Sequence, residues 1–277
     1  MSLRIATNVE SLVAQRHMNT TSASQKSNLE HLASGSRINK AADDAAGLAI
    51  SETMKSQIRS IRQASRNAQD GISMIQTAEG GMSEVGNILM RFRELSVQGA
   101  SDTLGDLDRT FIDKEVQQLK AEISRITEST EFNGKNLLSG VSGSISLQVG
   151  VHNIEEQDRI NLDTQKISVS LKSLGIESVS TMTRDASRDN LDKIDTAMRT
   201  LVENRSELGS MQNRLQSTVN NSAIYEENMS TANSRIRDAD IATESAELAK
   251  NNILSQAGVA VLSQANQNNM LALKLLG

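Results

Sequence analysis

The side chains that could support catalysis or bind a metal are few and scattered along this chain. The histidines, His17, His31 and His152, fall on separate segments without the HExxH spacing of a zinc protease, and there is no cysteine. The absence of cysteine excludes disulfides, thiolate catalysis and thiolate metal sites. We therefore interpret the histidines as solvated or packing residues.

The acidic clusters also lack the pattern of a catalytic or metal site. Asp43 and Asp44 are adjacent in a helical stretch, where side chains point about 100° apart, and acidic residues are favoured in the first turn of a helix. A further group lies in one short stretch: Asp102, Asp106, Asp108 and Asp113. This stretch lacks the glycine and the closing glutamate of a calcium loop, and no phosphate-binding or dinucleotide-binding glycine motif occurs. We predict no enzyme activity, no cofactor and no metal site.

The composition favours long, thin helical packing over a compact globular core. The chain has no proline, no tryptophan, one tyrosine and three phenylalanines, and its hydrophobic content is only 37%. Aromatic residues usually supply the bulk of a core, and proline would interrupt long helices. A net charge of −5 argues against a nucleic-acid partner.

Neither a membrane span nor a Sec signal peptide is expected. No apolar run approaches the roughly 18–20 residues that cross a bilayer. The start, MSLRIATNVESLVAQRHM, contains no continuous apolar region. We predict no membrane insertion and, if the protein leaves the cell, export by another route.

Helical spacing of apolar residues dominates the chain, with a short region of alternating spacing in the middle. The first helical stripe, in residues 1–35, comprises Ile5, Val9, Leu12, Leu29 and Leu32, and ends at Gly35. Further helices are predicted up to residue 100, with a break at Gly80–Gly81, and over about 107–128, with Phe111 inward.

Strict alternation in SGSISLQVGV, RINL and KISVSL predicts strands of a small sheet or hairpin at about 140–172. Helical spacing then returns over about 188–234 and 238–275. The predicted fold is mainly α, a long antiparallel helical bundle or coiled coil built from both termini, with a small central β-hairpin region.

Several longer motifs together resemble bacterial flagellin. LASGSRINKAADDAAGLAISETMKSQI covers residues 32–58, and MRFRELSVQGA covers residues 90–100. EFNGKNLL, ISLQVG and the terminal QANQNNMLALKLL follow in the family's order. The pattern L-x-S-G-x-R-I-N-x-A-x-D-D-A-A-G-L-A-I, matched from Leu32 to Ile50, is long and specific, and the match at the carboxyl end is independent of it.

The resemblance implies a structural subunit that polymerises into the extracellular filament of the bacterial flagellum, used for motility. Its main partner would be further copies of itself. The flagellar export apparatus, an export chaperone, the filament cap and hook-junction proteins would be the other partners. Residues 1–44 and 235–277 would form the inner coiled-coil layer, and 45–234 a helical rod domain. The short segment between Leu174 and Leu191 leaves no room for an outer domain.

The resemblance also assigns an expected inner-core subunit interface. Its residues are Ile5, Val9, Leu12, Ile253, Ala257, Ala260, Leu271, Leu273, Leu275 and Leu276. Residues two apart on a helix diverge by about 200°, so the leucine tail is apolar on several sides and needs partners on several sides.

The stretch at 90–100 resembles the site that a vertebrate Toll-like receptor recognises on flagellin. Arg91, Glu94 and Leu95 match that motif, Glu115 falls at the matching position on the next helix, and Met90 stands where the motif usually has Gln. We expect Arg91 and Leu95 to share one helix face that also makes lateral subunit contacts.

Two other functions share some of these features. A hook–filament junction protein has the same terminal architecture and export route, although its match to the Leu32–Ile50 stretch is usually weaker. A cytoplasmic coiled-coil scaffold would explain the helical ends but not the ordered motifs. Seeded polymerisation separates a flagellin from a scaffold.

Overall fold

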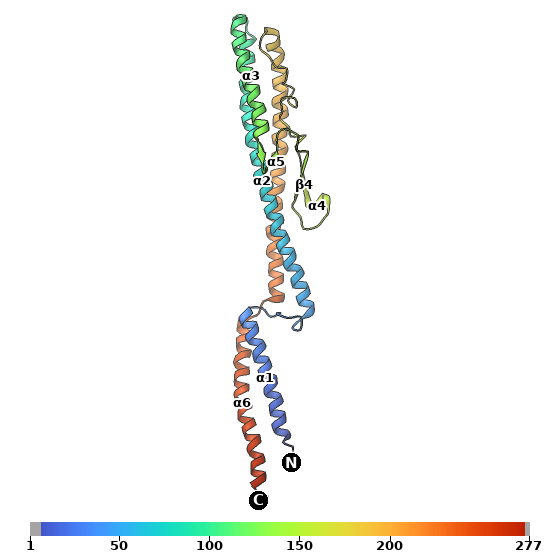
Figure 1. The fold of residues 1–277 in the computed structure, drawn as a ribbon, viewed down its shortest axis with the longest axis vertical. Helices are drawn as coiled ribbons and strands as arrows, with labels where there is room; N and C mark the ends of the chain where they lie inside the picture. The colour runs from blue at the N-terminus through green and yellow to red at the C-terminus, as the bar shows by residue number, and fades with distance from the viewer. Residues whose placement is uncertain (1–6, 275–277) are drawn as a thin grey trace. The chain divides into compact units, whose positions relative to one another are not determined.

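The computed structural model describes the backbone of residues 7–274 and the side chains of residues 7–267 (Figure 1). The long helices are α1 (Val9–Ser34), α2 (Ala45–Gly99), α3 (Asp106–Ser129), α5 (Arg184–Arg237) and α6 (Ile241–Lys274). Between α3 and α5 lie β1 (Glu131–Phe132), β2 (Lys135–Asn136), β3 (Ser144–Gln148), the short α4 (Glu155–Asp158) and β4 (Arg159–Asp163). The mainly α prediction, with both termini helical and a small β region, is confirmed.

The chain forms two compact units. One contains residues 1–58 and 227–277, and the other contains residues 59–226. The predicted boundaries between the inner coiled-coil layer and the rod domain, at 44/45 and 234/235, describe layers of an assembled filament. They therefore stay predictions.

In the first unit, α1 and α6 lie side by side and run antiparallel (Figure 1). Helix α1 begins where the Asn8 side chain accepts a 3.0 Å hydrogen bond from the Ser11 N–H, and it ends at Gly35, whose φ of 67° is left-handed. Before α6, the Asp240 carboxylate accepts hydrogen bonds from the Thr243 hydroxyl and the Ala242 N–H, each 2.9 Å, and these hold its pKa below the ordinary value. Both helices are thus capped by residue types that favour helix starts and ends.

The connector between α1 and α2 is pinned by backbone and carboxylate contacts. Ser36 forms a β-bridge with Asp238. The Asp43 carboxylate accepts hydrogen bonds from the N–H groups of Lys40 and Asn39, both 2.9 Å, which lower its pKa. Asp44 accepts a 2.8 Å hydrogen bond from the Gly47 N–H in the first turn of α2. The predicted capping role is confirmed for Asp44, whereas Asp43 stabilises the turn that precedes α2.

The core of the second unit lies among α2, α3, α5 and the β segments. Helix α2 contributes a continuous buried stripe that includes Met82, Val85, Leu89 and Phe92. This stripe corrects the predicted break at Gly80–Gly81, because α2 runs through both glycines. Each glycine costs a helix roughly 1 kcal/mol relative to alanine, and the packing on either side outweighs that cost.

Helix α3 occupies the predicted range but faces the core with a different residue at its start. Phe111 is exposed, whereas Ile112, Val116 and Ile123 are buried. The inward position belongs to Ile112 because it stands four residues before Val116, on the same face. The prediction that Phe111 faces inward is wrong.

The β region consists of two hairpins. Strands β3 and β4 are antiparallel, with Ile145 opposite Leu162 and Leu147 opposite Ile160. Strands β1 and β2 pair across Asn133–Gly134, whose φ angles of 49° and 75° suit the asparagine–glycine turn of a tight hairpin. This second hairpin was not predicted.

The third predicted strand, KISVSL, is not a strand. Its alternating Ile167 and Val169 are buried as expected, and the Val169 N–H donates to the Leu138 carbonyl at 3.1 Å. That single bond does not make a ladder, and the segment consists of turns and irregular chain.

Candidate subunit interface on α1 and α6

The contact seam between α1 and α6 is built mostly from polar and small residues, together with Met18, Leu248 and Leu262. On α6, the partly or fully buried positions recur at the three- and four-residue steps of a heptad pattern: Glu244, Leu248, Asn251, Ser255, Gly258, Leu262 and Ala265. On α1, the facing positions include Ser11, Ala14, Met18, Thr21, Gln25 and Asn28. Few large aliphatic side chains therefore contribute to the pairing of the two helices.

Hydrogen bonds cross this seam along its length. The Asn8 amide donates to the Ala265 carbonyl at 3.1 Å, and the Gln25 amide donates to Asn252 Oδ1 at 2.6 Å. Near the start of α6, His31 Nδ1 lies 3.1 Å from Glu244 Oε1. Buried polar groups of this kind fix the register of paired helices while adding little apolar stabilisation.

Most of the larger aliphatic side chains of the same helices are exposed, either on the outer faces or along the edge of the seam. On α1 the exposed ones are Val9, Leu12, Val13 and Leu29, and on α6 they are Ile253, Leu254, Val259 and Val261. Leu12 is 57% exposed and Ile253 66% exposed. The helix pair thus exposes to solvent apolar side chains whose contact with water is unfavourable in free energy.

The structure places the predicted interface residues as follows. Val9, Leu12, Ile253, Ala257 and Ala260 are all exposed in the single chain. These side chains therefore lie outside the buried seam of the helix pair, and their role between subunits stays a prediction. Ile5 and the side chains of the tail leucines, Leu271, Leu273, Leu275 and Leu276, lie outside the described residues.

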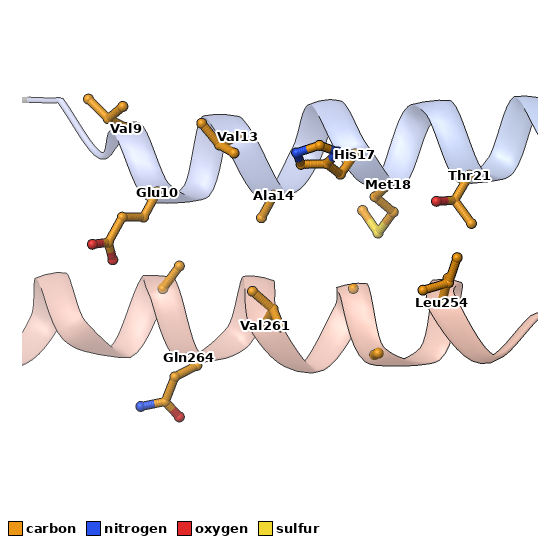
Figure 2. A pocket seen from close by; sticks show the side chains of 13 residues that line it. Val9, Glu10, Val13, Ala14, His17, Met18, Thr21, Leu254, Val261 and Gln264 are labelled. Atoms are coloured by element: carbon orange, nitrogen blue, oxygen red, sulfur yellow. The ribbon is translucent and has the colours of Figure 1, made fainter. Parts of the chain in front are cut away.

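Part of this apolar surface is hollowed into a groove of about 750 Å³ between α1 and α6 (Figure 2). Ala14 and Met18 point from α1 toward α6, and Leu254 and Val261 point from α6 toward α1. The small residues Ala257 and Gly258 also line the groove. Because these side chains are small, the groove has room for a side chain from another molecule.

Val13, Leu254 and Val261 were missed as interface candidates. A usable signal was present, because Val13 stands four residues after Val9 and so shares its helix face.

A second surface lies on α2 and α3 in the other unit. Arg91 Nη1 is 2.8 Å from Glu94 Oε2, and Arg91 Nε is 2.9 Å from Glu115 Oε1. The hydrogen bonds that Arg91 donates to the two carboxylates, the one to Glu94 first, raise the pKa of Arg91. Three of the four predicted residues are therefore brought together, and all three are exposed.

Leu95, the fourth, does not share that exposed face. Its side chain is 1% exposed and belongs to the core. Arg91 and Leu95 are offset by about 40° around the helix, enough for one to face solvent and the other the interior. Met90 and Val97 are the exposed apolar residues beside Arg93 and Glu94, around a shallow hollow of about 410 Å³.

The acidic and histidine candidates make separate structural contacts. Asp113 Oδ1 accepts hydrogen bonds from the Thr181 N–H at 2.7 Å and the Ser180 hydroxyl at 2.8 Å. Asp102 pairs with Arg184 at 3.0 Å, and Asp106 with Arg109 at 3.1 Å. Over the described residues, no group of three or more potential ligands is placed to hold a metal ion.

None of the helices that the structure describes combines the length and the apolar character needed to cross a bilayer.

Comparison with known proteins identifies the family. Residues 5–143 match the family model of the bacterial flagellin N-terminal helical region, and residues 191–276 match that of the C-terminal helical region. The chain belongs to the bacterial flagellin family. It is 44% identical to a flagellin of Halalkalibacterium halodurans, over 97% of this chain and 98% of that protein. It is 40% identical to a flagellin of Bacillus subtilis, over 99% of this chain and 100% of that protein.

Solved structures agree with this assignment. A Bacillus cereus flagellin crystal structure is 31% identical, with a TM-score of 0.51, and the match covers 57% of this flagellin and 88% of that chain. A putative flagellar hook-associated protein of Vibrio parahaemolyticus, 15% identical, has a TM-score of 0.57 over 71% of this flagellin and 100% of that chain. At that identity only the fold is shared, so the fold alone does not separate flagellins from hook-associated proteins.

The sequence relatives make that separation. This flagellin is a structural subunit of the flagellar filament, and its length matches that of short family members such as the Halalkalibacterium halodurans protein. The two family models leave residues 144–190 unmatched, and that segment contains the β3–β4 hairpin, α4, a stretch of turns and irregular chain, and the first residues of α5.

Proposed function

We propose that this flagellin polymerises into an extracellular filament through the outward apolar faces of α1 and α6. The observation that carries the proposal is the arrangement of the helix pair, with mostly polar and small residues in the seam and most of the aliphatic residues exposed. A helix pair that buries its apolar side chains internally has no need of neighbours. This pair leaves them for other copies to cover.

The free energy available is large enough to drive assembly. Full burial of a valine, leucine or isoleucine side chain contributes about 1.5–3 kcal/mol. Val9, Leu12, Ile253 and Val261 are each at least half exposed. Covering the exposed half of four such side chains would contribute roughly 3–6 kcal/mol per subunit.

The leucine tail extends the same interface in this proposal. Leu271, Leu273, Leu275 and Leu276 follow α6's exposed aliphatic residues in sequence and are apolar on several sides of any helix. We expect neighbouring subunits to surround them, together with Ile5 at the other end of the chain.

The Arg91–Glu94–Glu115 cluster is proposed as a lateral contact of the rod domain. Its three charged groups are satisfied within one chain and exposed, so a neighbour can add hydrogen bonds without stranding a charge. We propose the same surface as the binding site for a vertebrate Toll-like receptor, if one recognises this protein. Leu95 would take no direct part in either contact while α2 keeps its present packing.

Export as an unfolded chain is proposed from the composition. The absence of cysteine and proline removes crosslinks and slow prolyl isomerisation from the folding that follows export. The export apparatus, an export chaperone, the filament cap and hook-junction proteins would be the partners on this route. The proposed function involves neither catalysis nor nucleic-acid binding.

The test is seeded polymerisation of a double variant, Leu12→Gln with Ile253→Gln. Glutamine favours helices about as well as leucine does, so α1 and α6 can still form. Losing about 2 kcal/mol of apolar burial should raise the critical concentration about thirtyfold.

Val141→Gln is the matched control, because Val141 is 85% exposed in a turn of the other unit. It should assemble like the unmodified chain. Equal critical concentrations for all three proteins would refute the interface, and elongation of flagellar seeds distinguishes a flagellin from a scaffold.

A further inference from the structure

His17 is a titratable side chain on the wall of the α1–α6 groove (Figure 2). It is exposed in the single chain and makes no hydrogen bond or ion pair with any of the residues that the structure describes. Its neighbours along the groove are Val13, Met18 and Thr21 on the same helix. Anything that fills the groove therefore meets the imidazole directly.

The groove offers little to stabilise a charged imidazole. Glu10 is its one other titratable lining residue, two helical turns before His17 and so about 10 Å away along the axis. Arg16 is adjacent in sequence but points about 100° away and does not line the groove.

Helix α6 supplies neither a titratable nor a charged group to the groove. Its lining residues are Leu254, Ala257, Gly258, Val261, Gln264 and Ala265. Between Lys250 and Lys274 its sequence has no charged residue at all.

We propose that a second copy of the chain, on covering this groove, excludes water from His17 and requires it to be neutral, so that subunit addition is coupled to loss of a proton. This inference rests on the proposed assembly through α1 and α6. Removing water disfavours the charged form of a histidine, and no carboxylate of α6 is placed to offset that effect. Assembly is then weaker at mildly acidic pH than at neutral pH.

The size of the effect follows from proton linkage. The ordinary pKa of a histidine side chain is about 6.5, so the neutral fraction of such a group falls about tenfold between pH 7.5 and pH 5.5. If only the neutral form is covered, the critical concentration rises about tenfold between those two pH values.

His31 provides an internal comparison. It lies on the same helix, but its Nδ1 is 3.1 Å from Glu244 Oε1 within the chain, and both side chains are mostly buried. Its surroundings are set by α1 and α6 of one copy, so it does not depend on a neighbour covering it.

The experiment is seeded polymerisation of the full chain at pH 5.5 and 7.5, with His17→Gln and His31→Gln as the two variants. We expect the unmodified chain and His31→Gln to show the tenfold rise in critical concentration at pH 5.5, and His17→Gln to show less than a threefold rise. A tenfold rise retained in His17→Gln, or tighter assembly of the unmodified chain at pH 5.5, would overturn the inference.

Proton release gives a second readout that does not depend on the variant assembling. In weakly buffered solution near pH 6.5, polymerisation of the unmodified chain should release about half a proton per subunit, and no release overturns the inference. The two proposals fail separately. If the double variant Leu12→Gln with Ile253→Gln assembles normally, the proposed interface is wrong. If that double variant assembles poorly but His17→Gln keeps the full pH dependence, only the role of His17 is wrong.

Discussion

Replacing each glycine of the Gly80–Gly81 pair by alanine should change stability in opposite directions. Both residues lie inside α2, where alanine is favoured over glycine by roughly 1 kcal/mol. A Cβ at Gly80 meets no atom within 4 Å, so Gly80→Ala should stabilise the folded rod by about that amount. A Cβ at Gly81 would lie 2.7 Å from Thr130 Oγ1 and 2.8 Å from Leu138 Cδ1.

Those contacts are shorter than atoms tolerate, and overpacking of this kind costs about 1–3 kcal/mol. After the gain in helix propensity, Gly81→Ala should destabilise the rod by about 0–2 kcal/mol. Urea unfolding of the two monomeric variants, followed by circular dichroism, measures the difference. If Gly81→Ala stabilises the protein as much as Gly80→Ala does, the close packing of α2 against Thr130 and Leu138 is refuted.

Three further outcomes are expected. Asp113→Ala should lower the free energy of unfolding by about 1–3 kcal/mol, because it leaves the buried Thr181 N–H unpaired, and an unchanged urea midpoint would contradict this. The pKa of Asp240 is lowered by its hydrogen bonds to Thr243 and Ala242, so its stabilisation of α6 is present above the ordinary aspartate value of 3.8 and is lost as pH falls through the lowered value. The helicity lost in Asp240→Ala should therefore be larger at pH 5 than at pH 2, and a difference that grows at pH 2 would show the opposite linkage. Deleting residues 271–277 should leave the helices of the second unit, residues 59–226, folded as judged by circular dichroism, yet abolish elongation of seeds. Elongation at the wild-type rate would show that the tail is dispensable.

The parts of the fold that could be predicted from the sequence are those decided by one helix and its own buried face. Val116 and Ile123 repeat at helical spacing because they contact one continuous core, so α3 was predicted within one or two residues of its ends. The capping role of Asp44 follows from the preference of acidic residues for helix starts, and it too was correct.

The features that were mispredicted depend on which surfaces meet. Gly80–Gly81 looks like a break locally, and only the packing of Met82 and Val85 beside it shows that α2 continues. Leu95 lies three residues after the buried Phe92, and this spacing assigns it to the core more directly than its match to a receptor motif assigns it to the surface.

The seam of α1 and α6 was the least predictable part of the candidate site. The apolar spacing of α1 and α6 does not show which side chains meet within the chain, and across the seam Gln25 in fact donates a hydrogen bond to Asn252. Which side chains enter the seam depends on which ones neighbouring subunits cover on the outer faces. The residue pattern of one helix carries no information about those neighbouring copies.

A density map of the assembled filament at side-chain resolution would show whether neighbouring subunits cover the outer faces of α1 and α6. We expect Leu12 and Ile253, exposed in the single chain, each to be covered by side chains of neighbouring subunits, and the Gln25–Asn252 contact to stay within one subunit. A filament in which Leu12 and Ile253 face solvent or the central channel, with subunits joined through other surfaces, would contradict it.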